Sequence, residues 1–266
     1  MKNDTIAIIG AGNIGIAIAQ GLKASKEYKT SNIMLCRRKL SKLQSLKKQG
    51  FVISSNNLEA ARKADFIILA VQPKQLKGVI KGISEGLGKN KILISVVTGV
   101  SIAEIQSVVG PDCPVFVAMP NTAISIQRSM TCIATNNGSK AVQSRVLSMF
   151  NGMGKAIMIE ENLMAAATVL GACGIAYAMR FIRATSQGGI QIGFDADVAQ
   201  LITSQTVNGA ASLLLMSEKH PESEIDRVTT PRGCTIEGLN EMEHEGFSSA
   251  VIKGLTSSHR KITTIA

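Results

Sequence analysis

Residues 6–15 read Ile-Ala-Ile-Ile-Gly-Ala-Gly-Asn-Ile-Gly, so an apolar run leads directly into glycines at positions 10, 12 and 15. With this spacing Gly10 permits a tight turn out of a strand, Gly12 lets a phosphate approach the backbone, and Gly15 lets the next helix pack closely on the sheet. The helical run over residues 14–22 would direct its free N–H groups and its positive dipole end at those phosphates. The stretch predicts a dinucleotide-binding strand, turn and helix; the alternative is a glycine-rich turn that binds no ligand.

The end of the second predicted strand indicates which dinucleotide is preferred. A site for NAD(H) commonly has an Asp or Glu about 20 residues after the glycines, where the carboxylate accepts a hydrogen bond from the ribose 2′-hydroxyl. Here the strand at residues 32–35 runs into Cys36, Arg37, Arg38 and Lys39, without a carboxylate. Paired guanidinium donors suit a 2′-phosphate. We therefore expect NADP(H), with NAD(H) as the second candidate; the alternative is that both arginines are a solvated helix start.

Length and charge limit the classes of protein to consider. A chain of 266 residues is typical of two domains with sizeable cores. Residues 1–155 hold 21 Lys and Arg against 7 Asp and Glu, a charge of +14, whereas the remainder holds 8 against 12, a charge of −4. The basic half would attract a polyanionic cofactor. Nucleic-acid binding is disfavoured, because only 3% of residues are aromatic and the lysines do not cluster.

Cysteines and apolar runs indicate the compartment. The five cysteines, at positions 36, 113, 132, 173 and 234, form no Cys-x-x-Cys pair and have no histidine at ligand spacing, which predicts reduced thiols in the cytosol and no metal site. Residues 1–4 lead straight into the first strand, so no signal peptide is expected. The uncharged stretch at 163–179 is rich in Ala and Gly and is followed by Arg180 and Arg183, which favours a close-packed buried helix over a membrane span. We expect a cytoplasmic protein without a membrane partner.

The chain changes character near residue 160. Before it, short β-rich runs at 6–9, 33–35, 66–70, 92–96, 115–118, 130–133 and 156–159 alternate with helical segments, a pattern typical of a mostly parallel sheet covered by helices. After it, helices are predicted at 161–188, 195–217, 223–228, 235–245 and from 248 to near the end, with Asp195 as an N-cap. We expect an α/β Rossmann-type dinucleotide-binding domain at 1–160 and an all-α domain at 161–266. Small residues along the first two long helices predict close packing that a second subunit completes.

Several motifs resemble the Δ1-pyrroline-5-carboxylate reductases, which make proline with NADPH or NADH. They include the glycine turn, Ala-Val-Gln-Pro at 70–73, Ala-Met-Pro-Asn-Thr at 118–122, Pro-Arg-Gly-Cys-Thr-Ile at 231–236 and Gly-Phe-Ser-Ser-Ala at 246–250, and the similarity covers essentially the whole chain. The resemblance implies reduction of a cyclic imine as the last step of proline biosynthesis. It also implies an N-terminal Rossmann domain, a C-terminal domain that forms a homodimer, and often a ring of five dimers.

The resemblance also implies site residues. Met119, Pro120 and Asn121 would lie beside the nicotinamide. The full set expected at the cofactor is Gly10, Gly12, Asn13, Ile14, Gly15, Arg37, Arg38, Asn57, Ala70, Val71, Gln72, Pro73, Met119, Pro120 and Asn121. The set expected at the substrate is Thr230, Gly233, Cys234 and Thr235, with Thr235 as the catalytic residue.

The residues around Thr235 support its assignment independently. The substrate that the resemblance implies is a flat five-membered imine with a carboxylate, so its site would need an anion pocket and a hydrogen-bonding group near nitrogen. Residues 230–237 form a turn that leads into a helix, whose free N–H groups would bind the carboxylate while the Thr235 hydroxyl bonds the ring nitrogen. The alternative is that Thr235 only caps the helix.

Some positions depart from the family pattern. Residues 171–177 read Gly-Ala-Cys-Gly-Ile-Ala-Tyr where Ser-Gly-Ser-Gly-Pro-Ala-Tyr is usual, and loss of the proline predicts loss of a helix irregularity. Arg232 stands in place of a glycine, which costs strain if its φ is positive; if the side chain points inward it would pair with a carboxylate. Gln72 replaces the usual lysine. Two alternative functions therefore stay open: reduction of a different cyclic imine, or a catalytically weak NADP-binding paralogue.

Overall fold

The chain divides into two compact units. The computed structural model describes residues 2–217 and 219–264. The sheet unit comprises Met1–Cys173 with His259–Ala266, and the helical unit comprises Gly174–Ser258. The sheet unit continues past the predicted boundary at residue 160, because Met164, Thr168 and Val169 are buried, and Met164 belongs to the core on one face of the sheet.

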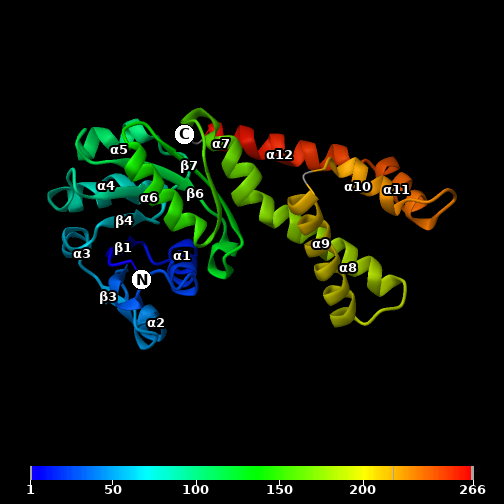
Figure 1. Cartoon of the computed structure of the whole chain (residues 1–266), viewed down its shortest axis with the longest axis horizontal. Helices are drawn as coiled ribbons and strands as arrows, with labels where there is room; N and C mark the ends of the chain where they lie inside the picture. The colour runs from blue at the N-terminus through cyan, green and yellow to red at the C-terminus, as the bar shows by residue number, and fades with distance from the viewer. Residues whose placement is uncertain (1, 218, 265–266) are drawn as a thin grey trace. The chain divides into compact units, whose positions relative to one another are not determined.

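An eight-stranded sheet forms the centre of the first unit (Figure 1). Its strands are β1 (Ile6–Ile9), β2 (Ile33–Cys36), β3 (Val52–Ser54), β4 (Phe66–Leu69), β5 (Ile92–Ser95), β6 (Val115–Met119), β7 (Ser129–Thr135) and β8 (Gly154–Met158). The strand order is β3-β2-β1-β4-β5-β6-β7-β8, and all neighbours are parallel except β6 and β7. The prediction of a mostly parallel sheet is confirmed. Strand β3 was not predicted, because it has three residues and none of them is fully buried.

Helices cover both faces of this sheet. They are α1 (Asn13–Ala24), α2 (Gln44–Lys48), α3 (Asn57–Lys63), α4 (Pro73–Ile83), α5 (Ile102–Val109), α6 (Lys140–Asn151) and α7 (Met164–Ala167). Successive strand residues point to opposite faces, so Ile6 and Ile8 join the core that includes α1 and α6, whereas Ala7 and Ile9 join the core that includes α3, α4 and α5. Each fully buried Ile contributes about 1.5–3 kcal/mol of burial free energy. Burial on both faces explains why these strands are continuously apolar.

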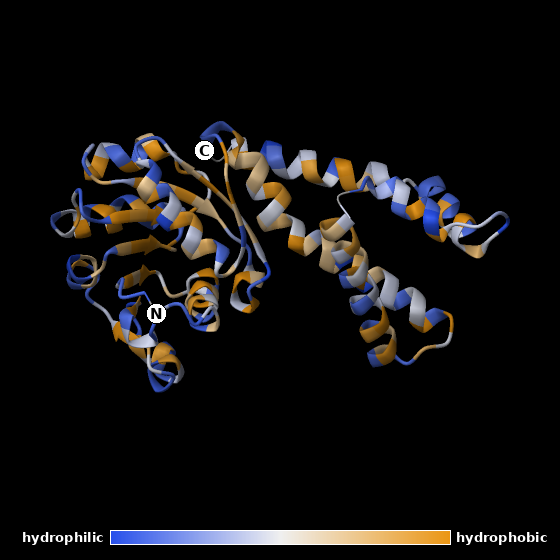
Figure 2. Ribbon diagram, viewed as in Figure 1, coloured by the Kyte–Doolittle hydropathy of each residue, from blue (hydrophilic) through white to orange (hydrophobic). Residues whose placement is uncertain are grey.

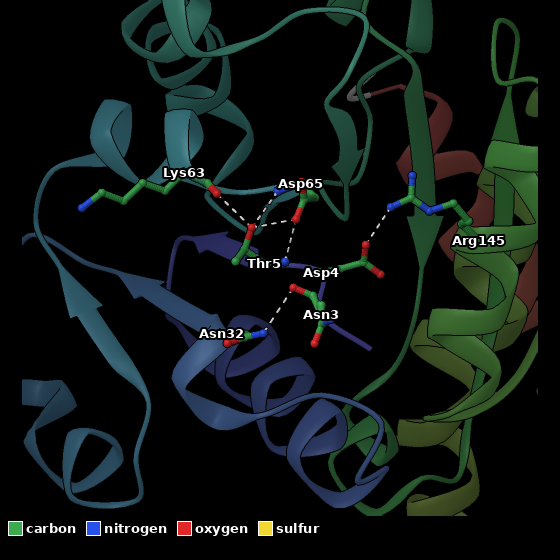
Figure 3. A network of polar contacts seen from close by, with 7 residues as sticks. All are labelled: Asn3, Asp4, Thr5, Asn32, Lys63, Asp65 and Arg145. Carbon is green, nitrogen blue, oxygen red and sulfur yellow. Dashed lines mark hydrogen bonds and ion pairs between the residues drawn. The ribbon is translucent and has the colours of Figure 1, made fainter. Parts of the chain in front are cut away.

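A polar network fixes the beginnings of β1 and β4 (Figure 3). The Thr5 N–H donates to Asp65 Oδ2 at 2.8 Å, and the Thr5 hydroxyl lies 2.8 Å from the same oxygen and 2.9 Å from the Lys63 carbonyl oxygen. Beside it, Arg145 Nη2 donates to Asp4 Oδ1 at 2.9 Å. The network holds β1 and β4 in register at the amino-terminal ends of these strands, opposite the glycine turn.

The helical unit contains long helices with little interior. Its elements are α8 (Gly174–Gln191), α9 (Ala196–Ser217), α10 (Pro221–Val228), α11 (Cys234–His244) and α12 (Phe247–Thr263), the last of which ends in the sheet unit. Helices α8 and α9 pack closely, since a methyl group on Gly189 would lie 3.1 Å from the Ala199 Cβ. Asp195 precedes α9, and its carbonyl accepts a hydrogen bond from the Ala199 N–H, as expected of an N-cap residue.

Large apolar side chains remain exposed in the helical unit, and Figure 2 shows apolar residues along α8 and α9 as well as along the strands. The most exposed are Met216 at 85%, Ile192 at 79%, Leu215 at 76% and Leu201 at 71%. The helical stretch Glu161–Gln191 is long and apolar enough to cross a membrane, and 11% of its most apolar window is buried. The expectation of a buried helix here is therefore wrong for a single chain. Helix α8 packs on α9 and contacts α12 through the Tyr177–Ser258 hydrogen bond and the Phe181–Phe247 ring pair, and several of its large apolar side chains stay exposed.

The same stretch contains an irregular segment. Residues Thr168–Cys173 form a π-helix, directly before α8 begins at Gly174. Ile175, which stands at the position of the family's proline, lies within the regular helix α8, and the irregular turn precedes it.

Candidate dinucleotide and substrate sites

The three glycines after β1 occupy three different environments. Gly10 has φ of +105°, and a side-chain carbon there would lie 2.4 Å from the Ala70 carbonyl oxygen. A carbon on Gly15 would lie 2.4 Å from the Gly10 carbonyl oxygen, so α1 can approach the turn only with glycine at this position. A carbon on Gly12 would meet no atom within 4 Å, and Gly12 caps α1 without a side-chain hydrogen bond. The turn therefore leaves open space and uncapped helix N–H groups where a phosphate needs them.

A cavity of about 780 Å³ opens beside this turn. Its lining comes from the carboxyl ends of β1, β2 and β4 and from the segments that follow β1, β2, β3 and β4, and the strand order reverses at β1. In open parallel sheets this switch point is where dinucleotides bind. The lining includes eight of the predicted cofactor residues: Gly10, Gly12, Arg37, Arg38, Asn57, Ala70, Val71 and Gln72. Size, position and open glycine turn all fit a dinucleotide.

The cavity is strongly basic. Arg37, Arg38, Lys39 and Lys42 line it, and none of the described lining residues is Asp or Glu. Lys42 lies on the 3₁₀ helix Leu40–Leu43 that follows β2. Sequence reasoning missed Lys42, Ser55 and Gln75 as lining residues; the only available signal for Lys42 was that it extends the run of cations after the second strand.

Four other predicted cofactor residues support the turn and its neighbours. Asn13 and Ile14 begin α1, Gly15 packs against the turn, and Pro73 is the first residue of α4, after Gln72 as its N-cap. These positions suit helix starts, and none of the four lines the cavity.

Met119, Pro120 and Asn121 lie at the end of β6, apart from the first cavity. Met119 lines a second cavity, of about 620 Å³, which Gly99, Thr168 and Thr263 also line. Asn121 is engaged structurally: its Oδ1 accepts a hydrogen bond from the Ala123 N–H at 3.0 Å, and its Nδ2 donates to the Gly171 carbonyl at 3.1 Å. The structure thus brings the glycine turn and arginines together in one cavity and places Met119 in another.

Glu161 is a further residue that sequence reasoning did not identify. Its Oε1 accepts a hydrogen bond from the Ile102 N–H at 2.6 Å, and its Oε2 accepts one from Asn136 Nδ2 at 2.8 Å. Glu161 therefore fastens the start of α5 to the end of β7 beside the second cavity.

Cys36 supports the glycine turn through its backbone. Its carbonyl oxygen accepts hydrogen bonds from the N–H groups of Gly10 and Ala11, each at 3.1 Å. Burial raises the pKa of the Cys36 thiol to about 12, so this thiol stays protonated near neutral pH. Among the residues described, no group of three or more His, Cys, Asp and Glu could hold a metal ion.

The predicted substrate residues lie in the helical unit, at the start of α11. The Gly233 N–H donates to the Thr230 carbonyl at 2.9 Å across a turn whose third residue, Arg232, has φ of +58°. Pro231 at the second place and positive φ at the third are typical of a type II turn, which favours glycine at the third place. Arg232 thus carries the strain expected for a side chain there, and it forms no ion pair with the described residues.

Thr235 is not the helix cap. Gly233 is the N-cap of α11 and supplies no side-chain bond, Cys234 begins the helix, and Thr235 is its second residue and is exposed. The N–H groups of the first turn are therefore left without a side-chain cap, and the Thr235 hydroxyl is free of a capping role.

Comparisons with known proteins agree with this architecture. Residues 161–265 match the family described as pyrroline-5-carboxylate reductase dimerisation, and residues 5–99 match the family described as NADP oxidoreductase coenzyme F420-dependent. Pyrroline-5-carboxylate reductase 1 of Dictyostelium discoideum is 45% identical over all of this chain, which spans 50% of that relative's length. Pyrroline-5-carboxylate reductase 2 of the same organism is 46% identical over 98% of this chain and 92% of the relative.

Solved structures give the same result. The Plasmodium falciparum pyrroline carboxylate reductase with NADP bound has a TM-score of 0.91 and 26% identity, covering 100% of this chain and 99% of that chain. The Coxiella burnetii pyrroline-5-carboxylate reductase has a TM-score of 0.90 and 28% identity over the same shares. The predicted fold class, a Rossmann-type domain followed by a helical dimerisation domain, is confirmed. The chain belongs to the pyrroline-5-carboxylate reductase family.

Proposed function

We propose that this chain reduces the C=N bond of Δ1-pyrroline-5-carboxylate to proline, with NADPH preferred over NADH. The observation that carries the proposal is the basic cavity beside the open glycine turn, in a chain of this family. A free carboxylate at the end of β2 would favour the ribose hydroxyl of NADH, and cations stand there instead.

The fit of the cavity assigns roles to its residues. Gly12 and the uncapped N–H groups of α1 would hold the pyrophosphate, and the basic segment after β2 would lie at the 2′-phosphate. Asn57, together with residues 70–73, would border the rest of the dinucleotide, with Met119, Pro120 and Asn121 beside the nicotinamide. When bound, the dinucleotide supplies a hydride.

The start of α11 would hold the substrate. The N–H groups of Cys234 and Thr235 would bind its carboxylate, with Thr230 and Gly233 shaping the turn, and the Thr235 hydroxyl would hydrogen bond the ring nitrogen. A protonated imine is already electrophilic, so the protein needs no strong acid. Thr235 orients the ring, and most of the rate then comes from holding the reactants together.

The proposal includes self-association in the cytoplasm, as a homodimer or a pentamer of dimers. Its support is the dimerisation family match and the exposed apolar side chains of α8 and α9. A second copy would cover this surface, so the apolar stretch at 161–191 would not need a membrane. Light scattering of the purified chain without detergent tests this: a mass of at least two chains is expected, and a monomer or an insoluble protein would contradict it.

The experiment for the activity follows NADPH absorbance with purified chain and Δ1-pyrroline-5-carboxylate, with parallel reactions containing NADH or the six-membered piperideine carboxylate. Oxidation dependent on the five-membered imine, faster with NADPH, is expected. Turnover of the larger ring alone would show that the chain reduces a different cyclic imine. The altered segment at 171–177 and the strained Arg232 are the features that favour this alternative. No NADPH oxidation with either ring, while NADPH still binds, would identify a non-catalytic paralogue.

A further inference from the structure

The four cations of the dinucleotide cavity are not equivalent. Arg37 Nη1 donates a hydrogen bond to the Ala11 carbonyl oxygen at 2.8 Å, and the Arg37 N–H donates to the Ser54 carbonyl at 3.1 Å. The preceding residue, Cys36, accepts two N–H groups from the other side of the same turn. The glycine turn is thus held by residues 36 and 37 together, and part of the Arg37 guanidinium is occupied by this contact.

Arg38, Lys39 and Lys42 are placed differently. All three are exposed, line the same cavity and form no ion pair with any described residue. Lys39 precedes the 3₁₀ helix Leu40–Leu43, and Lys42 lies on it, so this short helix brings a lysine back toward the end of β2. Three uncommitted cations facing one cavity carry enough positive charge to neutralise a phosphate monoester, which holds about −1.5 to −2 near neutral pH.

We propose that Arg37 is a positioning residue for the glycine turn, needed equally with and without a 2′-phosphate, and that Arg38, Lys39 and Lys42 recognise that phosphate. This inference rests on the proposed use of NADP(H). It separates the two arginines that the sequence places together, and it adds Lys42 as a residue that determines cofactor specificity.

The test is calorimetric titration of the full chain with 2′,5′-ADP and with 5′-AMP, which differ only in the 2′-phosphate. Arg38→Ala and Lys42→Ala should each weaken 2′,5′-ADP binding about five- to tenfold and change AMP binding less than about twofold. Arg37→Ala should weaken both nucleotides by the same factor. Arg37→Lys should restore part of both affinities, because an ammonium group can also donate to the Ala11 carbonyl.

Lys47→Ala is the matched control. Lys47 is an exposed lysine on α2 outside the cavity, so its removal changes net charge equally and should leave the selectivity unaltered. Selective loss of 2′,5′-ADP in Arg37→Ala would overturn the positioning role, and wild-type selectivity in both Arg38→Ala and Lys42→Ala would overturn the phosphate assignment. A wild-type chain that binds both nucleotides equally would contradict the proposed NADPH preference itself, and the phosphate assignment with it.

Discussion

Alanine at Gly12 and alanine at Gly15 should have opposite effects, although the two residues are three positions apart in one motif. Gly15→Ala places a methyl carbon 2.4 Å from the Gly10 carbonyl oxygen and 3.2 Å from its carbon, so α1 must move away from the turn. Overpacking against rigid backbone outweighs the roughly 1 kcal/mol that alanine adds to a helix, for a net loss of about 2 kcal/mol. For a chain of this size that corresponds to a Tm about 4–8 °C lower.

Gly12→Ala should instead preserve the fold and block the cofactor. The Gly12 backbone has φ of −92°, which alanine adopts freely, and its side chain would meet no atom within 4 Å. We expect the free energy of unfolding to change by less than about 1 kcal/mol. The methyl group would keep the pyrophosphate away from the helix N–H groups and weaken NADPH binding about 100-fold, or about 2.7 kcal/mol.

Thermal unfolding by circular dichroism and titration of NADPH fluorescence measure the two effects separately. NADPH binding at wild-type strength in Gly12→Ala, or an unchanged Tm in Gly15→Ala, would refute the assignment of the two glycines.

Three further predictions follow from single residues. Arg232→Gly should raise the free energy of unfolding by about 1 kcal/mol, since φ of +58° strains any side chain, and a Tm no higher than that of wild type would contradict this. Burial raises the pKa of Asp65, but the hydrogen bonds from Thr5 outweigh it and hold this pKa below its ordinary value. The ionised Asp65 therefore stabilises the fold fully above its ordinary pKa, and this stabilisation is lost as the pH falls through its lowered pKa. Asp65→Asn should make the free energy of unfolding, measured with urea, fall less steeply over this acid range. The same pH dependence as wild type would contradict this role of Asp65. Thr235→Val should lower kcat at least about tenfold with the NADPH Kd nearly unchanged, while Thr235→Ser keeps most activity; equal kcat in all three proteins would end the catalytic assignment.

Local patterns predicted the part of the molecule that depends on neighbours in sequence. The glycine spacing identified the turn because Gly10 needs a positive φ and Gly15 lies against the Gly10 carbonyl oxygen, both local features of the strand, turn and helix. The apolar runs identified the strands because both faces of the sheet are buried. The edge strand β3 was not predicted because it is short and only partly buried.

Other features depend on contacts between distant segments. Lys42 faces the cavity because a 3₁₀ turn returns the chain toward β2. Glu161 accepts its two hydrogen bonds only because the fold brings Ile102 and Asn136 beside it. Asn121 matched a motif, yet both ends of its amide group are engaged by Ala123 and Gly171. The exposed faces of α8 and α9 show the limit of the argument from small residues: such stripes indicate close packing and do not say which chain supplies the other surface.

The measurement that tests the central claim most directly is the fate of deuterium from NADPH carrying two deuterons at the nicotinamide C4. After reaction with Δ1-pyrroline-5-carboxylate, mass spectrometry should find one proline per NADPH consumed, with one deuterium on the former imine carbon. Proline without deuterium, or NADPH oxidised without proline, would contradict the account of this chain as a pyrroline-5-carboxylate reductase.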